Sequence, residues 1–213
     1  MEKGVFEKSF IEKLDKNFPE LSKYFEFNLE IFCEFNTLIF EINKCLILEF
    51  HRATITLTNN LLERLLKLAL INNETGIGPI PIEKWNEVFK EPNRKYGSIP
   101  LGNSIEKCKK LGLLSEQEKH FLFNIIRELM RNGFSHADSS KILADLPDNS
   151  PMFQGSLTNP NADLKEVGIN QKIIPTFQAL QMENFAKENA KDYFDFVFHL
   201  IFRIEERLKE KQK

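Results

Sequence analysis

Hydrophobic residues recur at helical spacing along most of the chain, with polar residues between them. No proline or glycine interrupts the stretch from Phe25 to about Leu70, so the sequence predicts one long helix or two nearly continuous helices there. The first apolar stripe consists of Ile31, Phe35, Leu38, Ile42 and Cys45. The segment RATITLTNN alternates polar with apolar residues and would also suit a strand. The helical periodicity on both sides of this segment favours a helix.

The segment LLERLLKLAL carries a wide apolar stripe that suits the core of a helical bundle. The stripe places Leu61, Leu65 and Leu68 on one face, with Leu62, Leu66 and Ala69 beside them. The next segment, NNETGIGPIPIE, contains two glycines and two prolines, so it should end the helix and form a connector. We expect a short helix around Trp85, a second loop at EPNRKYGSIP, and a helix from near Ser104 that closes at Gly112.

Ser115 and Glu118 are three residues apart and form the signature of a capping box, which predicts the start of another helix. This helix should begin at Glu116 and run directly into Arg131. Its predicted apolar side consists of Leu122, Ile126 and Leu129, with Ile125 close by.

The periodic pattern stops after His136, and residues 139–172 predict a long loop without a strand pair, apart from one turn of helix at KILADL. A final helix is predicted from about Pro175, because proline suits the first turn of a helix. Its later stripe consists of Tyr193, Val197, Leu200, Ile204 and Leu208. The charged tail EERLKEKQK is expected to be a solvated, fraying end.

These elements predict one all-α domain over the 213 residues, a length that can bury one core. The predicted parts are a helical extension at 1–45, a core motif region at 46–138, the long loop at 139–172 and a C-terminal helix at 173–213. The phenylalanine-rich stripe from Phe25 to Phe50 is interpreted as core, with any additional exposed face available as a dimer contact.

The formal net charge of -2 argues against a broadly basic surface that grips duplex nucleic acid, although a small local phosphate site remains open. We find no basic recognition helix of the kind a DNA-binding repressor needs. The N-terminus lacks the pattern of a signal peptide, and the run LIFEINKCLILEF is too charged to span a membrane. We therefore expect a core helix in that run and no membrane partner.

The cysteines Cys33, Cys45 and Cys108 are odd in number and form no C-x-x-C pair, which favours a reducing, cytoplasmic setting. Four histidines at no shared helical spacing predict no metal site, and we expect no cofactor. We interpret His51 and His120 as surface residues and His199 as a core or interface residue.

The stretch IRELMRNGFSHAD, at 126–138, has two interpretations. In the structural one, Arg131 favours the negative end of the helix dipole, Asn132 and Gly133 stop the helix, and His136 satisfies loose carbonyls. In the functional one, a break at Gly133 brings Arg131 and His136 to one surface, although a straight helix would hold them roughly 140° apart. An imidazole can move a proton and a guanidinium can brace a phosphate, which suits metal-free cleavage of RNA.

The motif R-N-G-F-S-H resembles the R-N-x-x-x-H signature of the HEPN superfamily, small helical domains that dimerise and include many metal-independent ribonucleases. The block IPLGNSIEKCKKLGLLSEQEKHFLFNIIRELMRNGFSHA is similar to part of the mannitol operon repressor family, a HEPN relative. The segment HRATITLTNNLLERLLKLAL is similar to the long helix of that family, which carries an acidic residue where this chain has Glu63. Together these matches span about Phe50 to Asp138.

The resemblance implies a HEPN-like bundle and a homodimer whose two motifs face each other across a cleft. It implies that Arg131 and His136 are the catalytic pair, that Asn132 orients a phosphate or the arginine, and that Glu63 is a supporting residue. The implied activity is a metal-independent endoribonuclease of toxin or phage-defence type, acting on RNA and controlled by an antitoxin or regulatory protein. The alternative is a non-catalytic regulatory or protein-interaction module, and Glu63 is equally compatible with a structural ion pair.

Overall fold

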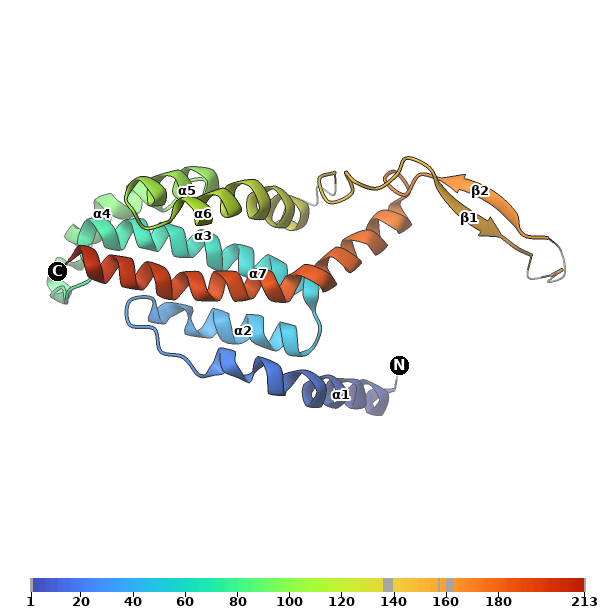
Figure 1. Ribbon diagram of the computed structural model, residues 1–213. Coiled ribbons are helices and arrows are strands. Elements are labelled where there is room, and N and C mark those ends of the chain that lie inside the picture. Colours follow the sequence, from blue (N-terminus) through green and yellow to red (C-terminus); the bar gives the residue numbers. More distant parts are fainter. Residues whose placement is uncertain (1, 136–139, 157, 160–162, 213) are drawn as a thin grey trace.

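A computed structural model describes residues 2–135, 140–156, 158–159 and 163–212. The described chain is mostly helical and confirms the predicted all-α bundle (Figure 1). The helices lie in three layers, with the longest two in the middle. Among the described residues, no helix combines the length and the apolar character that crossing a bilayer requires.

The middle layer pairs α3 (His51–Thr75) with α7 (Pro175–Lys211). The ambiguous RATITLTNN segment is helical, as predicted. The hydroxyl of Thr54 donates to the Phe50 carbonyl at 3.1 Å, and that of Thr58 donates to the Thr54 carbonyl at 2.7 Å. These bonds to the preceding turn satisfy two buried hydroxyls inside the helix, so the alternating threonines do not require a strand.

One outer layer contains α1 (Lys3–Leu21) and α2 (Asn36–Ile47), linked through two short 3-10 helices at Ser22–Phe25 and Cys33–Phe35. The prediction of continuous helix from Phe25 is therefore wrong for residues 26–32. Glu205 of α7 is only 4% exposed and accepts the backbone N–H groups of Ile31 and Phe32 at 2.7 and 2.9 Å. In a helix those N–H groups would donate to backbone carbonyls of the preceding turn. Here they donate to a carboxylate far along the chain, so this contact outweighs the local helical pattern of the sequence.

The second outer layer contains a 3-10 turn at Ile82–Lys84, α4 (Trp85–Tyr96), α5 (Leu101–Lys110), α6 (Glu116–Phe121) and the π-helical segment η4 (Leu122–Ser135). The predicted loop at EPNRKYGSIP is wrong in its first part, because residues 91–96 complete α4 and include a buried Pro92. The Tyr96 hydroxyl donates to Glu74 of α3 at 2.7 Å, and Lys95 pairs with the same carboxylate at 2.6 Å. These contacts hold the last turn of α4 on α3.

The predicted apolar face of the helix after α6 is confirmed at Leu122 and Ile126 but not at Ile125, and the segment is π-helical. Leu122, Ile126 and Met130 are buried at four-residue spacing, whereas Ile125 is 39% exposed. A π-helix joins residue i to residue i+5, so its turns are wider than those of an α-helix and an i+3 neighbour leaves the buried side. The side chain of Leu129 lies outside the described part of the structure.

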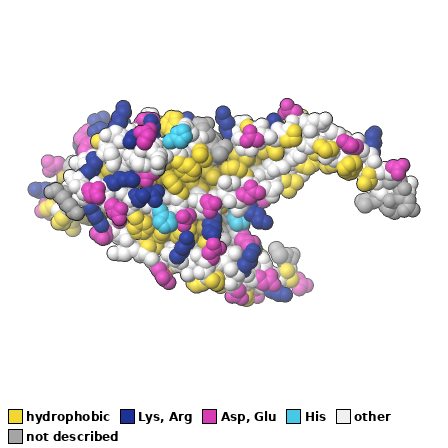
Figure 2. All heavy atoms as spheres, in the orientation of Figure 1, with side chains coloured by type: hydrophobic (Ala, Val, Ile, Leu, Met, Phe, Trp, Pro, Cys, Tyr) yellow, Lys and Arg dark blue, Asp and Glu magenta, His cyan; other side chains and the backbone are white. Residues whose placement is uncertain are grey.

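The long loop contains an antiparallel hairpin of β1 (Ser150–Gln154) and β2 (Lys165–Ile169), so the prediction of no strand pair is wrong. Met152 lies opposite Val167, but Phe153 lies opposite Glu166, and this weak alternation explains why the pattern did not predict strands. The KILADL segment forms hydrogen-bonded turns. The hairpin and the first part of α7 project from the bundle as an arm with visible hydrophobic side chains (Figures 1 and 2).

The final helix begins at Pro175, and all five positions of its predicted stripe are buried. The prediction of a frayed tail is wrong, because α7 continues to Lys211 and Leu208 is fully buried. Charged residues of the tail are also engaged, since Glu205 binds backbone N–H groups and Arg207 binds a buried carboxylate.

Candidate functional site

The end of η4 that carries the R-N-G-F-S-H motif is anchored to α3 by a buried amide. The Asn59 side chain donates from Nδ2 to the Met130 carbonyl at 3.1 Å. Asn59 in turn accepts a hydrogen bond on Oδ1 from the Tyr193 hydroxyl of α7 at 2.8 Å. Asn59 and Tyr193 are each 2% exposed, so their polar groups require hydrogen-bond partners inside the bundle. The link fixes the backbone immediately before Arg131.

A second contact fixes the backbone after Asn132. The Phe134 ring stacks on Phe185 of α7, with ring centroids 6.0 Å apart, and Gly133 is buried. The motif segment is therefore tied to α3 on one side and to α7 on the other. The structure describes the backbone of Arg131 and Asn132 but not their side chains, and His136 lies outside the described residues.

Glu63 lies on α3 one helical turn after Asn59 and is partly exposed. Burial raises the pKa of Tyr193 well above its usual value, and the negative charge of Glu63 raises it further. Four residues are about one turn of an α-helix, so Glu63 and Asn59 lie on the same side of α3. The backbone before Arg131 is therefore attached to a buried polar link, and Glu63 lies one helical turn from the Asn59 of that link.

Glu63 also lines a polar pocket of about 290 Å³ between α3 and the end of α4. The lining residues are Asn60, Glu63, Arg64, Lys67, Leu68, Ile71, Asn93 and Gly97. Neither Arg64 nor Lys67 forms an ion pair with any residue that the structure describes. Two such cations beside amide side chains can hold an anion such as a phosphate.

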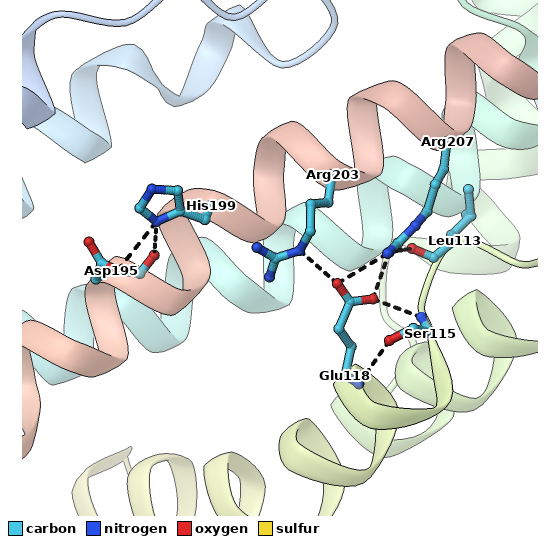
Figure 3. Close-up of polar contacts among 7 residues, drawn as sticks. All are labelled: Leu113, Ser115, Glu118, Asp195, His199, Arg203 and Arg207. Atoms are coloured by element: carbon cyan, nitrogen blue, oxygen red, sulfur yellow. Dashed lines mark hydrogen bonds and ion pairs between the residues drawn. The ribbon is translucent and has the colours of Figure 1, made fainter.

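The start of the α6–η4 unit is fixed by a buried carboxylate (Figure 3). The capping box is confirmed: Glu118 accepts the Ser115 backbone N–H at 2.7 Å, and Ser115 Oγ accepts the Glu118 backbone N–H at 3.1 Å. The same carboxylate accepts Arg203 Nε at 2.7 Å and Arg207 Nη1 at 2.6 Å, both from α7. Burial alone would raise the pKa of Glu118, but these donors outweigh it and lower the pKa.

The three described histidines form no hydrogen bond or ion pair with Asn59, Tyr193 or Glu118. His199 is exposed rather than in the core, and its Nδ1 lies 3.4 Å from Asp195 Oδ2 (Figure 3). His120 is exposed, as predicted, and contacts Asn124 at 2.9 Å. His51 is half-buried, and burial lowers its pKa. Among the described residues, no group of histidine, cysteine and carboxylate side chains could hold a metal ion, and the three cysteines are free.

Sequence reasoning did not identify Asn59 and Tyr193 as parts of the site. Asn59 is a polar residue within an apolar helix, four residues before Glu63, and that position is a usable signal. Tyr193 belongs to the predicted core stripe, where a buried hydroxyl requires a hydrogen-bond partner. Arg64 and Lys67 could not be recognised as pocket residues from the sequence, because single cations on an amphipathic helix are common.

Comparison of the chain with protein-family models, curated proteins and solved structures gives no match. The resemblance to the HEPN superfamily therefore depends on the motifs in the sequence.

Proposed function

We propose that this chain is a metal-independent endoribonuclease of HEPN type, in which Arg131, Asn132 and His136 act on RNA with support from Glu63. The observation that carries the proposal is the anchoring of η4. Asn59 and Tyr193 hold the backbone before Arg131 against α3, close to Glu63, and the Phe134–Phe185 stack holds the backbone after Asn132. Such support on both sides of a short polar motif is what a preorganised site requires.

In the proposed reaction, the 2'-hydroxyl of a ribose attacks the adjacent phosphorus while the 5'-oxygen of the next nucleotide leaves. His136 takes the proton from the 2'-hydroxyl or gives a proton to the leaving oxygen, and Arg131 stabilises the charge on the phosphorane. Arg64 and Lys67 bind a neighbouring phosphate in the pocket beside Glu63. The product carries a 2',3'-cyclic phosphate.

The π-helical geometry of η4 supports this assignment. π-helical turns are rare in proteins, and single π-helical turns inside α-helices occur frequently at functional sites. η4 carries the backbone of Arg131, Asn132 and Gly133 and ends at Ser135, so the first part of the motif lies on such turns.

The proposed enzyme acts as a homodimer in the cytoplasm, and the three free cysteines suit that compartment. We place it among toxin or phage-defence ribonucleases whose activity an antitoxin or regulatory protein controls.

A non-catalytic regulatory or interaction module is the second candidate, and the surface charge favours it. The net charge is -2, and Figure 2 shows cationic and anionic side chains intermixed over the visible face of the bundle. Such a surface gives little attraction for long stretches of RNA, so a module of this kind would use the dimer cleft to bind a protein or a nucleotide.

Incubation with mixed RNA in excess chelator tests the proposal. The wild-type protein should cleave RNA and leave cyclic phosphate ends, and His136→Ala and Arg131→Ala should each lower the rate by about 100-fold or more. His120→Ala is the matched control, because this exposed histidine should not affect cleavage. Overexpressed wild-type protein should also slow growth, and both site variants should relieve the effect. A folded wild-type dimer that leaves RNA intact would support the regulatory module.

A further inference from the structure

The opposite outer layer contains an apolar groove between α1 and α2, separated from η4 by the α3–α7 layer (Figure 1). This α1–α2 groove has a volume of about 760 Å³ and is lined by Phe10, Ile11, Leu14, Phe18, Phe25, Phe40, Lys44, Ile47 and Leu48. Ile11 is 58% exposed and Phe18 is 44% exposed. Leu21 is the one fully buried residue of α1, so most of the apolar face of this helix has no cover in the single chain.

The groove is nearly uniform in chemistry. Lys44 is the one charged residue among its lining residues, and every other lining side chain is a hydrocarbon or an aromatic ring. The groove extends from Phe10 to Phe18 along α1, which corresponds to about 12 Å of helix. Its volume falls in the range of small-molecule sites, which are typically apolar with a few polar groups that set orientation. These walls suit a flexible hydrocarbon chain.

Lys44 supplies the orienting group. Its ammonium lies 4.6 Å from the centroid of the Phe40 ring and forms no ion pair with any residue of the described ranges. In contrast, Lys16 and Lys13 on the adjacent rim pair with Glu49, at 2.9 and 3.7 Å. Asn17 donates to the Ile47 carbonyl at 2.9 Å. The polar groups of this rim are thus already satisfied, and Lys44 offers one contact to an anion.

We propose that the α1–α2 groove binds a free single-chain amphiphile, with its acyl chain between the two helices and its anionic head group on Lys44. A single unpaired cation matches one head group, whereas a docked peptide would bring several polar side chains to a rim that has no further partners for them. A bilayer is disfavoured because exposed cations of α1 already have carboxylate partners, as in Lys3–Glu7, Lys8–Glu12 and Lys16–Glu49. Such a helix has little excess positive charge to attract an anionic membrane.

Calorimetric titration of the full chain with laurate, below its micelle concentration, tests the proposal. We expect one site per chain, and decanoate should bind roughly tenfold more weakly than laurate because it buries two fewer methylenes. Lys44→Ala should weaken laurate binding roughly two- to fivefold, and Lys44→Arg should restore it. Lys90→Ala is the matched control, because Lys90 is an exposed lysine on α4 without an ion pair to a described residue. Ile11→Glu should abolish binding while the melting temperature stays near that of the wild type.

Three results would overturn the proposal. Equal binding of laurate and dodecanol, unaffected by Lys44→Ala, would remove the role of the head group. Binding to anionic vesicles without binding to monomeric laurate would assign the groove to a membrane surface. Absence of laurate binding, together with a concentration-dependent dimer that Ile11→Glu dissociates, would assign it to a second copy of this chain.

Discussion

On the α7 side of the bundle two buried carboxylates have a full set of donors, whereas on the α1 side a broad apolar face remains in water. Glu118 binds two arginines and a backbone N–H, and Glu205 binds the backbone of the chain before α2. α1 is attached to the rest by Leu21 and by pairs at the surface, such as those of Glu49.

This difference shows that hydrophobic patterning alone does not decide which helix becomes core. The apolar stripe of α7 is buried, and polar side chains of the same helix form hydrogen bonds and ion pairs. α1 also has apolar residues, but it forms few buried polar contacts. Buried polar groups are costly when unpaired, so satisfied ones fix a unique arrangement more strongly than exposed pairs do. The α1 layer should therefore respond weakly to substitutions that severely affect the α7 layer.

The largest effect is expected for Glu118→Ala. This change removes the capping box and leaves Arg203 and Arg207 without their carboxylate, so the free energy of unfolding should fall by about 3 kcal/mol. Urea unfolding measures the loss. Glu116→Ala is the control, because its exposed pair with Lys109 should contribute less than about 1 kcal/mol. Equal losses for the two variants would contradict the role given to Glu118.

A smaller effect is expected for Glu205→Gln. The amide has one carbonyl oxygen and no charge, so its bonds to the Ile31 and Phe32 N–H groups should weaken and stability should fall by about 1–2 kcal/mol. Amide hydrogen exchange at these two residues should accelerate more than in Glu206→Gln, which changes an exposed neighbour. Unchanged exchange at both amides would show that the carboxylate does not hold this segment.

The smallest effect concerns Glu49, whose pKa is lowered to about 2 by hydrogen bonds from Lys16 and Asn17. Its pKa in the unfolded chain is about 4.3. Because the folded pKa is the lower one, the contribution to stability is present above about pH 4.3 and is lost as the pH falls toward 2. Glu49→Gln should remove this part of the acid dependence, worth less than about 1 kcal/mol. Urea midpoints from pH 5 to pH 2 measure it, and an unchanged slope in the variant would contradict the assignment.

The elements that the sequence predicts well depend on neighbours along the chain. The capping box of Ser115 and Glu118 and the start of α7 at Pro175 follow from local rules. The failure at residues 26–32 has a distant cause, since the carboxylate that captures their N–H groups belongs to Glu205. The wide turns of η4 leave Ile125 outside the buried face, where a period of 3.6 residues would place it beside Leu122 and Ile126.

The candidate site shows the same division. Arg131, Asn132, His136 and Glu63 are conspicuous as residue types within a familiar motif, and their roles stay predictions. The Asn59–Tyr193 link could not be predicted, because it joins residues 134 positions apart through a contact that only the packing of α3 on α7 creates.

The bond between Glu205 and the Ile31–Phe32 backbone also has a consequence for biosynthesis. A ribosome delivers the phenylalanine-rich segment before α2 first, but the carboxylate that binds its backbone follows 173 residues after Phe32. The first helices must therefore stay partly uncovered until the ribosome has added the 174 residues that separate Ile31 from Glu205. For a nascent chain this is the period in which a chaperone, or a neighbouring chain on the same messenger, has access to those rings.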